Sequence, residues 1–504
     1  MKRREFIRNM GLLGGSMALG LNGIPLKAFS SPLLLNIEQT NGKILVLLQM
    51  NGGNDGLNTL IPYEDDLYYN KRPQIGIKKQ DVVALNEFTG LNPAMAGFRN
   101  LYEDGKLGIV QNVGYENHNR SHFRSTDIWL SGSDADQNLY DGWVGRSLSY
   151  MYPDFETDIP EHPMAIQLGA VESMLLQSPI GSMSVVFENP NTFYQMVSGS
   201  IADDDPPEST LAGTELAFLR KISSQSTNYA SVVKEKADKG KNTVTYPNTS
   251  IGKQLAIVAS LIAGGLETPV YLTTISGFDT HANQLTAHAK TLTQLSEAIT
   301  AFQSDLETTG MADRVVLMTF SEFGRRVEEN GSRGTDHGTA APLFVIGKSV
   351  SGGIIGGNPN LVNLDKNGDL LHQYDYRQIY TTILQDHLGL NKAKTEAILG
   401  KSYEKLNLFH KSAETGFSFA PLQLNKVYPN PFQYSAAFEY ELKRSIHIRL
   451  SIFDLQGREV AVIYDGLQNA GRHSQHFSNR LATGTYIALL SGEGRQSSKK
   501  VVVV

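Results

Sequence analysis

Residues 43–50 read KILVLLQM. A nearly continuous apolar run of this kind is typical of a strand that is buried on both faces of a sheet. Four later segments have the same character: LGIVQNVG (107–114), PVYLTTISG (269–277), RVVLMTF (314–320) and APLFVIG (341–347). The pattern therefore predicts a set of strands buried inside a large α/β core.

Segments with a helical pattern lie between these strands. In residues 283–308 an apolar stripe recurs at spacings of three, four or seven, and it consists of Leu285, Leu292, Leu295, Ile299, Phe302 and Leu306. Such a stripe indicates an amphipathic helix. Strands that alternate with helices predict a doubly wound α/β sheet with helices on both faces, spanning residues 42–415. A cap inserted at about residues 165–250 is a further expectation, since a polar, proline-containing loop lies there.

Length and composition narrow the classes of function. The 504 residues suffice for two or three domains. The net charge of -6 offers no basic surface for nucleic acid. The chain has no cysteine, so oxygen and imidazole are the strong metal ligands that it can offer.

The N-terminus predicts export. Arg3 and Arg4 stand in a basic head, and a short, glycine-interrupted apolar segment follows. The head resembles the twin-arginine export motif, and small residues near position 30 suit a signal peptidase. We expect residues 1–30 to be a signal peptide read by the twin-arginine translocase, with an ordinary secretory signal as the alternative. No later segment reads as membrane-spanning.

The C-terminal residues 421–504 differ in pattern from the body. Short alternating runs such as IHIRLSIFDL (446–455) are separated by turn signals, which predicts a small antiparallel β-sandwich. YPNPF (428–432), FDLQGREV (453–460), AGRH (470–473) and GTY (484–486) follow one another in order. This series resembles the type A sorting domain of the type IX secretion system. The resemblance implies passage through the outer membrane to the cell surface or beyond; a carbohydrate- or partner-binding module is the alternative.

Acids and histidines follow the predicted strands of the body. Ligands of open α/β sheets bind beyond the carboxyl ends of the strands. Asp55 follows the first strand, Asp279 and His281 follow residues 269–277, and Asp336 and His337 precede residues 341–347. These five residues are the predicted metal ligands, although Asp55 can equally shape a turn.

The spacing of the two later pairs bears on how they bind. Asp279 and His281 are two apart, so on an extended segment they point to one side. Asp336 and His337 are adjacent and need a turn, for which Gly334 and Gly338 supply backbone freedom. Carboxylate and imidazole without thiolate suit Zn²⁺ or Mn²⁺, as one or two ions that stabilise charge on a phosphate or sulfate oxygen.

Ser121 is the candidate nucleophile. It is the predicted N-cap of a helix that begins HFRSTDIW, and backbone N–H groups there favour an anion. Arg120 and Arg124 are candidates for binding substrate oxygens. His122 completes the predicted catalytic set with Ser121 and Arg120. Taken alone, Ser121 can be a simple helix cap.

Glu322 and Arg325 follow the strand at residues 314–320. They can form a structural ion pair that holds two loops together.

Six motifs of the body resemble, in order and spacing, the family catalogued as domain of unknown function 1501. They are NGGNDGLNTLIPY (51–63), NHNRSHFRSTDIWLSG (117–132), GWVGR (142–146), GFDTH (277–281), TFSEFGRR (319–326) and GTDHGTAAPLFVIG (334–347). That family is similar to the alkaline phosphatase and sulfatase superfamily, which places a strand-end aspartate, a helix-cap nucleophile and two later acid–histidine pairs around one or two metals. The resemblance puts Asp55, Ser121, Asp279 with His281, and Asp336 with His337 in these roles.

Departures from the superfamily pattern are also visible. The first late pair is more closely spaced than usual, and no sulfatase-type Cys- or Ser-x-Pro-x-Arg motif occurs. For the final ligand, His372 is the nearby histidine and Asp375 is the alternative, and the neighbouring Arg377 is a further residue of interest at this position. We expect a secreted metal-dependent hydrolase of phosphate or sulfate esters, on small molecules or polysaccharides. The alternative is a non-catalytic binding or assembly protein of the cell surface that keeps the alkaline phosphatase-like fold.

Overall fold

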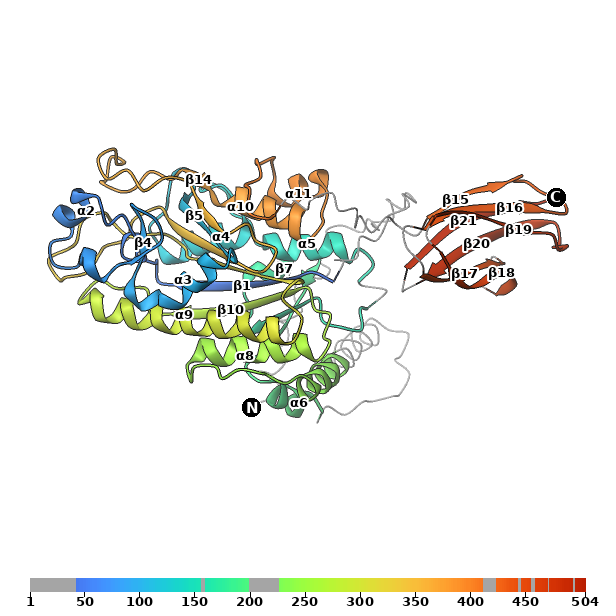
Figure 1. The fold of residues 1–504 in the computed structure, drawn as a ribbon, viewed down its shortest axis with the longest axis horizontal. Helices are drawn as coiled ribbons and strands as arrows, with labels where there is room; N and C mark the ends of the chain where they lie inside the picture. Colours follow the sequence, from blue (N-terminus) through green and yellow to red (C-terminus); the bar gives the residue numbers. More distant parts are fainter. Residues whose placement is uncertain are drawn as a thin grey trace, which may run out of the picture. The chain divides into compact units, whose positions relative to one another are not determined.

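The computed structural model describes residues 42–155, 159–198, 226–410, 423–442, 446–454, 458–469, 471–492 and 495–504 (Figure 1). The chain divides into two compact units, Met1–His410 and Lys411–Val504. The expected signal peptide lies outside the described residues, as do residues 199–225 of the expected cap.

Within the described residues, the first unit is built on a nine-stranded sheet in the order β13-β5-β12-β11-β1-β10-β6-β9, with β14 paired to β5. The strands are β1 (Ile44–Asn51), β5 (Leu107–Gly114), β6 (Ala165–Leu168), β9 (Val185–Phe187), β10 (Val270–Ser276), β11 (Val315–Phe320), β12 (Ala341–Ile346), β13 (Gly353–Ile355) and β14 (Tyr374–Asp375). The five apolar runs recognised in the sequence all lie on strands of this sheet. β6 and β9 fall within the range of the expected cap.

One of these nine described strands runs against the others. β1 is parallel to both β10 and β11. β12 is antiparallel to β11 on one side and to β5 on the other. The beginning of β12 therefore lies at the same edge of the sheet as the ends of β1, β10 and β11.

Both faces of the sheet are covered, which explains the continuous apolar run of β1. Alternate residues of a strand point to opposite faces. Ile44, Val46 and Leu48 belong to one core, and Leu45 and Leu47 to the other.

Figure 1 shows the helices on the two sides of the sheet. The first core is closed by α3 (Ala96–Glu103), α8 (Ser250–Ala263) and α9 (Gln284–Thr308). The second is closed by α4 (His122–Ser131), α5 (Trp143–Met151), α10 (Tyr376–Thr382) and α11 (Lys392–Leu399). The predicted α/β sheet with helices on both faces is confirmed.

The long helix α9 follows its predicted pattern with one exception. Leu292, Leu295 and Ile299 are fully buried, and Phe302 and Leu306 nearly so. Leu285 lies in the first turn and is 40% exposed. The stripe thus packs on the sheet from Leu292 onward.

Besides a helical segment at residues 226–239, the described part of the first unit contains several shorter elements. They are η1 (Gly56–Asn58), β2 (Leu60–Ile61), α2 (Asp66–Lys71), η2 (Lys79–Asp81), β3 (Val83–Ala84), β4 (Gly90–Leu91), η3 (Pro93–Met95), η4 (Met174–Leu176), β7 (Gln177–Ser178), β8 (Gly181–Ser182), α6 (Pro190–Ser198) and the π-helical turn η5 (Ile383–His387). β2, β3 and β4 form a small sheet of their own.

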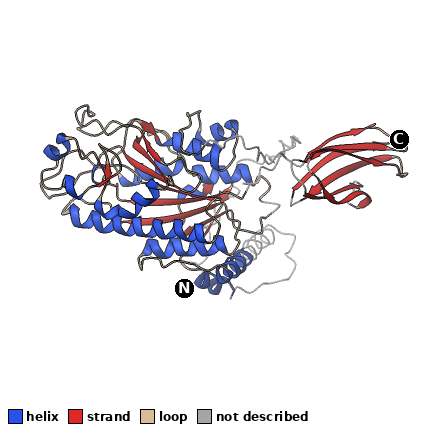
Figure 2. Cartoon of the chain, viewed as in Figure 1, coloured by secondary structure: helices blue, strands red, loops and turns tan. Residues whose placement is uncertain are grey.

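The second unit is all β (Figure 2). Its described strands are β15 (Gln423–Tyr428), β16 (Ala436–Leu442), β17 (Ile446–Phe453), β18 (Glu459–Gln468), β19 (Gly471–Phe477), β20 (Gly484–Gly492) and β21 (Arg495–Val503). They form two antiparallel sheets, β15-β16-β19 and β18-β17-β20-β21. Phe438, Leu450, Ala488 and Val501 belong to the core of this unit. These antiparallel sheets fit the predicted β-sandwich.

Candidate metal centre

The inverted direction of β12 brings two ligand-bearing loops together. Asp279 and His281 follow β10, and residues 321–340 connect β11 to β12. Because β12 begins at the edge where β10 and β11 end, Asp336 and His337 reach that edge by preceding their strand rather than following it. Four of the five predicted metal ligands therefore lie together.

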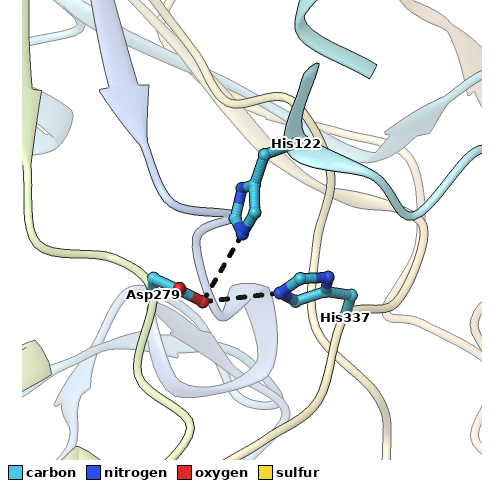
Figure 3. A group of neighbouring side chains, drawn as sticks. All are labelled: His122, Asp279 and His337. Atoms are coloured by element: carbon cyan, nitrogen blue, oxygen red, sulfur yellow. Dashed lines mark ion pairs between the residues drawn. The ribbon is translucent and has the colours of Figure 1, made fainter. Parts of the chain in front are cut away.

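Asp279 is the centre of the cluster. Its Oδ1 lies 2.6 Å from Nη2 of Arg325, and 3.1 and 3.4 Å from Nε2 of His281 and His337. Nε2 of His122, at the start of α4, lies 3.6 Å from the same oxygen. Figure 3 shows His122 and His337 pointing at this carboxylate from two sides.

The hydrogen-bond partners fix the orientation of the three imidazoles. Nδ1 of His122 lies 2.8 Å from Oε1 of Glu322, and Nδ1 of His281 lies 3.2 Å from Oδ1 of Asp336. Nδ1 of His337 lies 2.8 Å from the carbonyl oxygen of Arg120. Carbonyl and carboxylate oxygens only accept, so each Nδ1 carries a proton.

In the neutral form each Nε2 then offers a lone pair. The Nε2 atoms of His281 and His337 face each other at 2.9 Å, and Asp279 Oδ1 lies beside them. Three imidazole nitrogens and a carboxylate oxygen converge with lone pairs. The guanidinium of Arg325 contacts two of these four atoms, Oδ1 of Asp279 at 2.6 Å and Nε2 of His281 at 3.4 Å. Imidazoles that donate their other N–H to a fixed acceptor are the usual form of metal-binding histidine.

The charge state of the cluster suits a cation. Partial burial would raise the pKa of Asp279, but the hydrogen bond and charge of Arg325 outweigh it and hold the pKa below its ordinary value. Burial lowers the pKa of His337, against the opposing effect of its bond to Arg120. Asp279 is therefore ionised and His337 neutral near pH 7, as ligands must be.

The donor set is compact. One ligand atom each from His122, Asp279 and His337 lie within 4.8 Å of one another. Asp279, His281 and His337 form a second such trio, with their ligand atoms 2.9–3.4 Å apart, so the four side chains overlap in one cluster. His122, predicted as catalytic, is thus placed among the candidate ligands, and nothing in its sequence context signalled this.

Glu322 and Arg325 do not bind each other but hold separate parts of the centre. The buried carboxylate of Glu322 accepts from the backbone N–H of Gly52 at 2.9 Å and from Ser321 at 3.1 Å, besides His122. The fully buried guanidinium of Arg325 donates to the carbonyls of Gly53 and Thr335 at 2.7 and 2.9 Å. Arg325 is therefore locked in place beside Asp279. Both residues were predicted as a structural ion pair. The position of Glu322 directly after a strand was the one sequence feature that could have placed it at the candidate site.

Asp55, the fifth predicted ligand, is not among the residues of this cluster. Its carboxylate is completely buried and pairs with Arg72 at 2.6 Å. Burial alone would raise the pKa of Asp55, but the charge and hydrogen bond of Arg72 hold it below its ordinary value. The carboxylate of Asp55 thus neutralises the buried guanidinium of Arg72.

Ser121 occupies the predicted N-cap of α4. Its hydroxyl makes no capping hydrogen bond and the residue is exposed. Its two neighbours both contact the cluster, Arg120 through its carbonyl and His122 through its ring. Ser121 is therefore held at the rim of the centre.

The guanidinium groups of Arg120 and Arg124 are bound within the protein. Arg120 pairs with Asp369 and, at 3.3 Å, with Asp365. Arg124 donates to the carbonyls of Ala135 and Gln137. Neither guanidinium is therefore free for the predicted role of binding substrate oxygens.

The proposed last ligands also contact other parts of the protein. The ring of His372 stacks edge-on against His118, with centroids 5.8 Å apart. Asp375 is the N-cap of α10 and accepts from Arg377 at 2.7 Å. None of these residues has a described contact with Asp279.

Gly334 and Gly338 are required for space rather than for an unusual backbone angle. A Cβ on Gly334 would lie 2.3 Å from the backbone of His281, and a Cβ on Gly338 2.4 Å from that of Arg325. Neither has a positive φ. The loop that carries Asp336 and His337 thus packs backbone to backbone on its neighbours.

Fold and site together define a mixed α/β protein with a centre of imidazoles and a carboxylate at one edge of its sheet, followed by an all-β unit. Residues 192–405 match the family model described as "Protein of unknown function (DUF1501)". Residues 426–504 match that of the "Secretion system C-terminal sorting domain". The chain thus contains a region that matches the DUF1501 model, followed by a type IX sorting domain, and the latter indicates export to the cell surface or the extracellular space.

Comparison with known proteins adds distant similarities of fold. No curated protein matches the chain. A protein of the alkaline phosphatase superfamily from Vibrio parahaemolyticus is 10% identical, with a TM-score of 0.33, and covers 80% of this chain and 76% of its own. Phosphonate monoester hydrolase from Silicibacter pomeroyi is 9% identical (TM-score 0.31; 91% and 89% covered), and a sulfatase from Pseudoalteromonas sp. is 13% identical (0.31; 88% and 84%). At such scores the function has to be argued from the site itself.

In the described part of the chain, no helix combines the length and the apolar character that a membrane crossing needs.

Proposed function

We propose that the first unit is a metal-dependent hydrolase of phosphate or sulfate esters. His122, His281, His337 and Asp279 would hold one divalent ion, zinc or manganese. The observation that carries the proposal is the orientation of the imidazoles: each Nδ1 has its own acceptor, and the three Nε2 atoms converge on one carboxylate oxygen. Nitrogen and oxygen donors in this number suit these ions. One ion is proposed because the donor atoms form a single cluster around Oδ1 of Asp279, and Asp55 is not part of it.

A bound divalent ion supplies positive charge for an ester oxygen and lowers the pKa of a nearby hydroxyl. Ser121 is the proposed nucleophile, because its hydroxyl makes no capping hydrogen bond and it lies at the N-terminus of α4, where N–H groups favour an anion. Glu322, Asp336 and the carbonyl of Arg120 keep the imidazoles in the orientation described. Arg325 balances the charge of Asp279.

The route of export is part of the proposal. We infer that the twin-arginine translocase moves the folded chain to the periplasm and that the type IX machinery then takes it across the outer membrane. The substrate would be an ester on a small molecule or a polysaccharide outside the cell. The sorting domain supports the second step.

The test combines metal content with turnover. Purified protein is expected to carry one zinc or manganese ion per chain and to hydrolyse an aryl phosphate or an aryl sulfate. His337→Ala should lose the metal, and His476→Ala, an exposed histidine of the second unit, should keep it. Ser121→Ala should keep the metal and lose turnover. A wild-type protein that binds no metal and hydrolyses neither ester contradicts the proposal.

The second candidate is a binding or assembly protein of the cell surface that retains this fold without catalysis. The engagement of Arg120 and Arg124 within the protein favours it, since neither guanidinium is free for a substrate. Full metal content without turnover in wild type and Ser121→Ala alike would support this candidate.

A further inference from the structure

A buried amide lies behind the candidate metal centre. Gln284 is the first residue of α9 and is completely buried. Its Nε2 donates to Oδ2 of Asp55. Its Oε1 accepts from the hydroxyls of Thr280 at 3.1 Å and Thr335 at 2.7 Å.

These partners stand on three loops that build the centre. Thr280 lies between Asp279 and His281, and Thr335 directly precedes Asp336. Asp55 ends the loop whose Gly52 donates to Glu322. The amide of Gln284 therefore joins the loops after β1 and β10 to the loop before β12.

Only an amide satisfies all three partners at once. The carboxylate of Asp55 needs a donor, and the two hydroxyls need an acceptor. A glutamate here would place a second carboxylate against Asp55 in a buried site, which is costly. A leucine of similar size would leave both hydroxyls without this acceptor.

We propose that Gln284 is a positioning residue that sets the spacing of the metal ligands, and that Asp55 acts through it rather than on the metal. The proposal rests on the metal site of the proposed function. Arg72 fixes Asp55 with an ion pair at 2.6 Å and also donates to the carbonyls of Arg326 and Val327. Asp55 is thus an anchored point to which Gln284 ties the two ligand-bearing loops.

The main variant keeps the loops in contact. The backbone N–H of Thr335 donates to the carbonyl of Thr280 at 3.2 Å, and that of Gln284 to Arg333 at 2.9 Å. Gln284→Leu leaves these bonds and the Asp55–Arg72 pair in place, so we expect the variant to fold. Gln303→Leu is the matched control, because Gln303 is also a buried glutamine of α9 but its amide donates to Glu307, away from the centre.

The first measurement is zinc affinity by calorimetric titration of the folded, metal-depleted proteins. Gln284→Leu should weaken binding by about tenfold or more, with one ion per chain retained, because partners that orient ligands change affinity on this scale. Gln303→Leu should change it by less than about twofold. Equal affinity in wild type and Gln284→Leu, or equal weakening in both variants, overturns the proposal.

If Gln284→Leu does not fold, a smaller substitution at Thr335 tests the same proposal. Thr335→Val removes one of the hydroxyls, and Thr335→Ser retains it. Thr339→Val is the control: Thr339 is equally near His337 in sequence and buried, but its hydroxyl donates to the carbonyl of Leu370. Weaker zinc binding is expected for Thr335→Val alone, and an equal loss in Thr339→Val overturns the proposal.

Amide hydrogen exchange without metal separates this proposal from the function. Gln284→Leu should speed exchange in residues 279–281 and 335–337, and Gln303→Leu should not. If wild type binds no zinc, the proposed function fails, and this measurement still decides the role of Gln284. Unchanged exchange in both loops overturns it.

Discussion

At the scale of single residues, burial keeps three histidines outside the candidate metal centre neutral. It lowers the pKa of His288 and His387 to about 4 and that of His118 to about 3. His288 contacts Asn54 at 2.9 Å, and His387 contacts the carbonyl of Ile44 at 2.9 Å. In the unfolded chain all three return to about 6.5.

This difference predicts loss of stability in mild acid. Below about pH 6.5 these histidines become protonated in the unfolded chain but stay neutral in the folded chain. The free energy of unfolding is therefore highest above this pH and falls as the pH drops toward 4. Each histidine contributes up to ~1.4 kcal/mol per pH unit in that window. Urea unfolding of the first unit at pH 7, 6 and 5 measures the slope. His387→Gln should reduce it, and an unchanged slope would count against the neutral state of His387.

A second residue-scale prediction concerns Gly334. Gly334→Ala would push a Cβ into the backbone of His281, so we expect a loss of about 1–3 kcal/mol in the free energy of unfolding and weaker metal binding. Gly331→Ala, in the same loop but with open space around it, should stay within about 0.5 kcal/mol of wild type. Equal unfolding energies for the two variants in urea would refute the packing argument.

The sequence predicted part of this site and missed part for a physical reason. Asp279, His281, Asp336 and His337 were found because strand ends concentrate polar side chains at one edge. The role of Asp55 was not predictable, because Arg72 reaches it from the end of α2, a position that no periodicity marks. A carboxylate that binds a metal and one that binds a buried arginine look alike in the sequence.

At the scale of elements, α9 is held to the sheet by its apolar stripe. Leu295→Ala removes a fully buried side chain, so we expect a loss of about 2–5 kcal/mol in the free energy of unfolding. Leu285→Ala, in the exposed first turn, should cost well under half as much. Denaturant titrations of the two variants make the comparison. Similar losses would mean that the stripe extends to Leu285 after all.

The direction of β12 is the element-scale feature that the sequence did not reveal. An apolar run such as APLFVIG has the same pattern whichever way the strand runs. Direction is set by the pairing partners, here the preceding strand β11 and β5, which is distant in the chain. The presence and burial of the strand were predictable from its own residues, and its orientation was not.

At the scale of the whole molecule, the two units have separate cores. A protein truncated after His410 should therefore keep the Tm and metal content of the first unit, because no residue of its described hydrophobic clusters is removed. Scanning calorimetry and elemental analysis of the truncated and full-length proteins test this. A large fall in Tm would show that the tail contributes to the stability of the first unit.

The order of motifs in the tail predicted the function of the second unit, whereas the motifs of the body predicted a family but no reaction. YPNPF, FDLQGREV and GTY form a series that the family model for residues 426–504 supports. The body offered motifs of a family without an assigned reaction, so its chemistry had to be read from the geometry of the site.

The reversed β12 has a consequence for how this protein can vary. Two parallel strands are joined by a crossover connection that runs from one edge of the sheet back to the opposite edge. An insertion in such a connection must still allow the chain to cross over. Between β11 and β12 the chain leaves and re-enters on the same side, and residues 321–340 never cross over. Insertions in that stretch would add residues beside the candidate centre without changing the order or direction of the strands. Relatives with different substrates are expected to differ first at the exposed residues 331–333 of this stretch, while the residues flanking His337 stay unchanged.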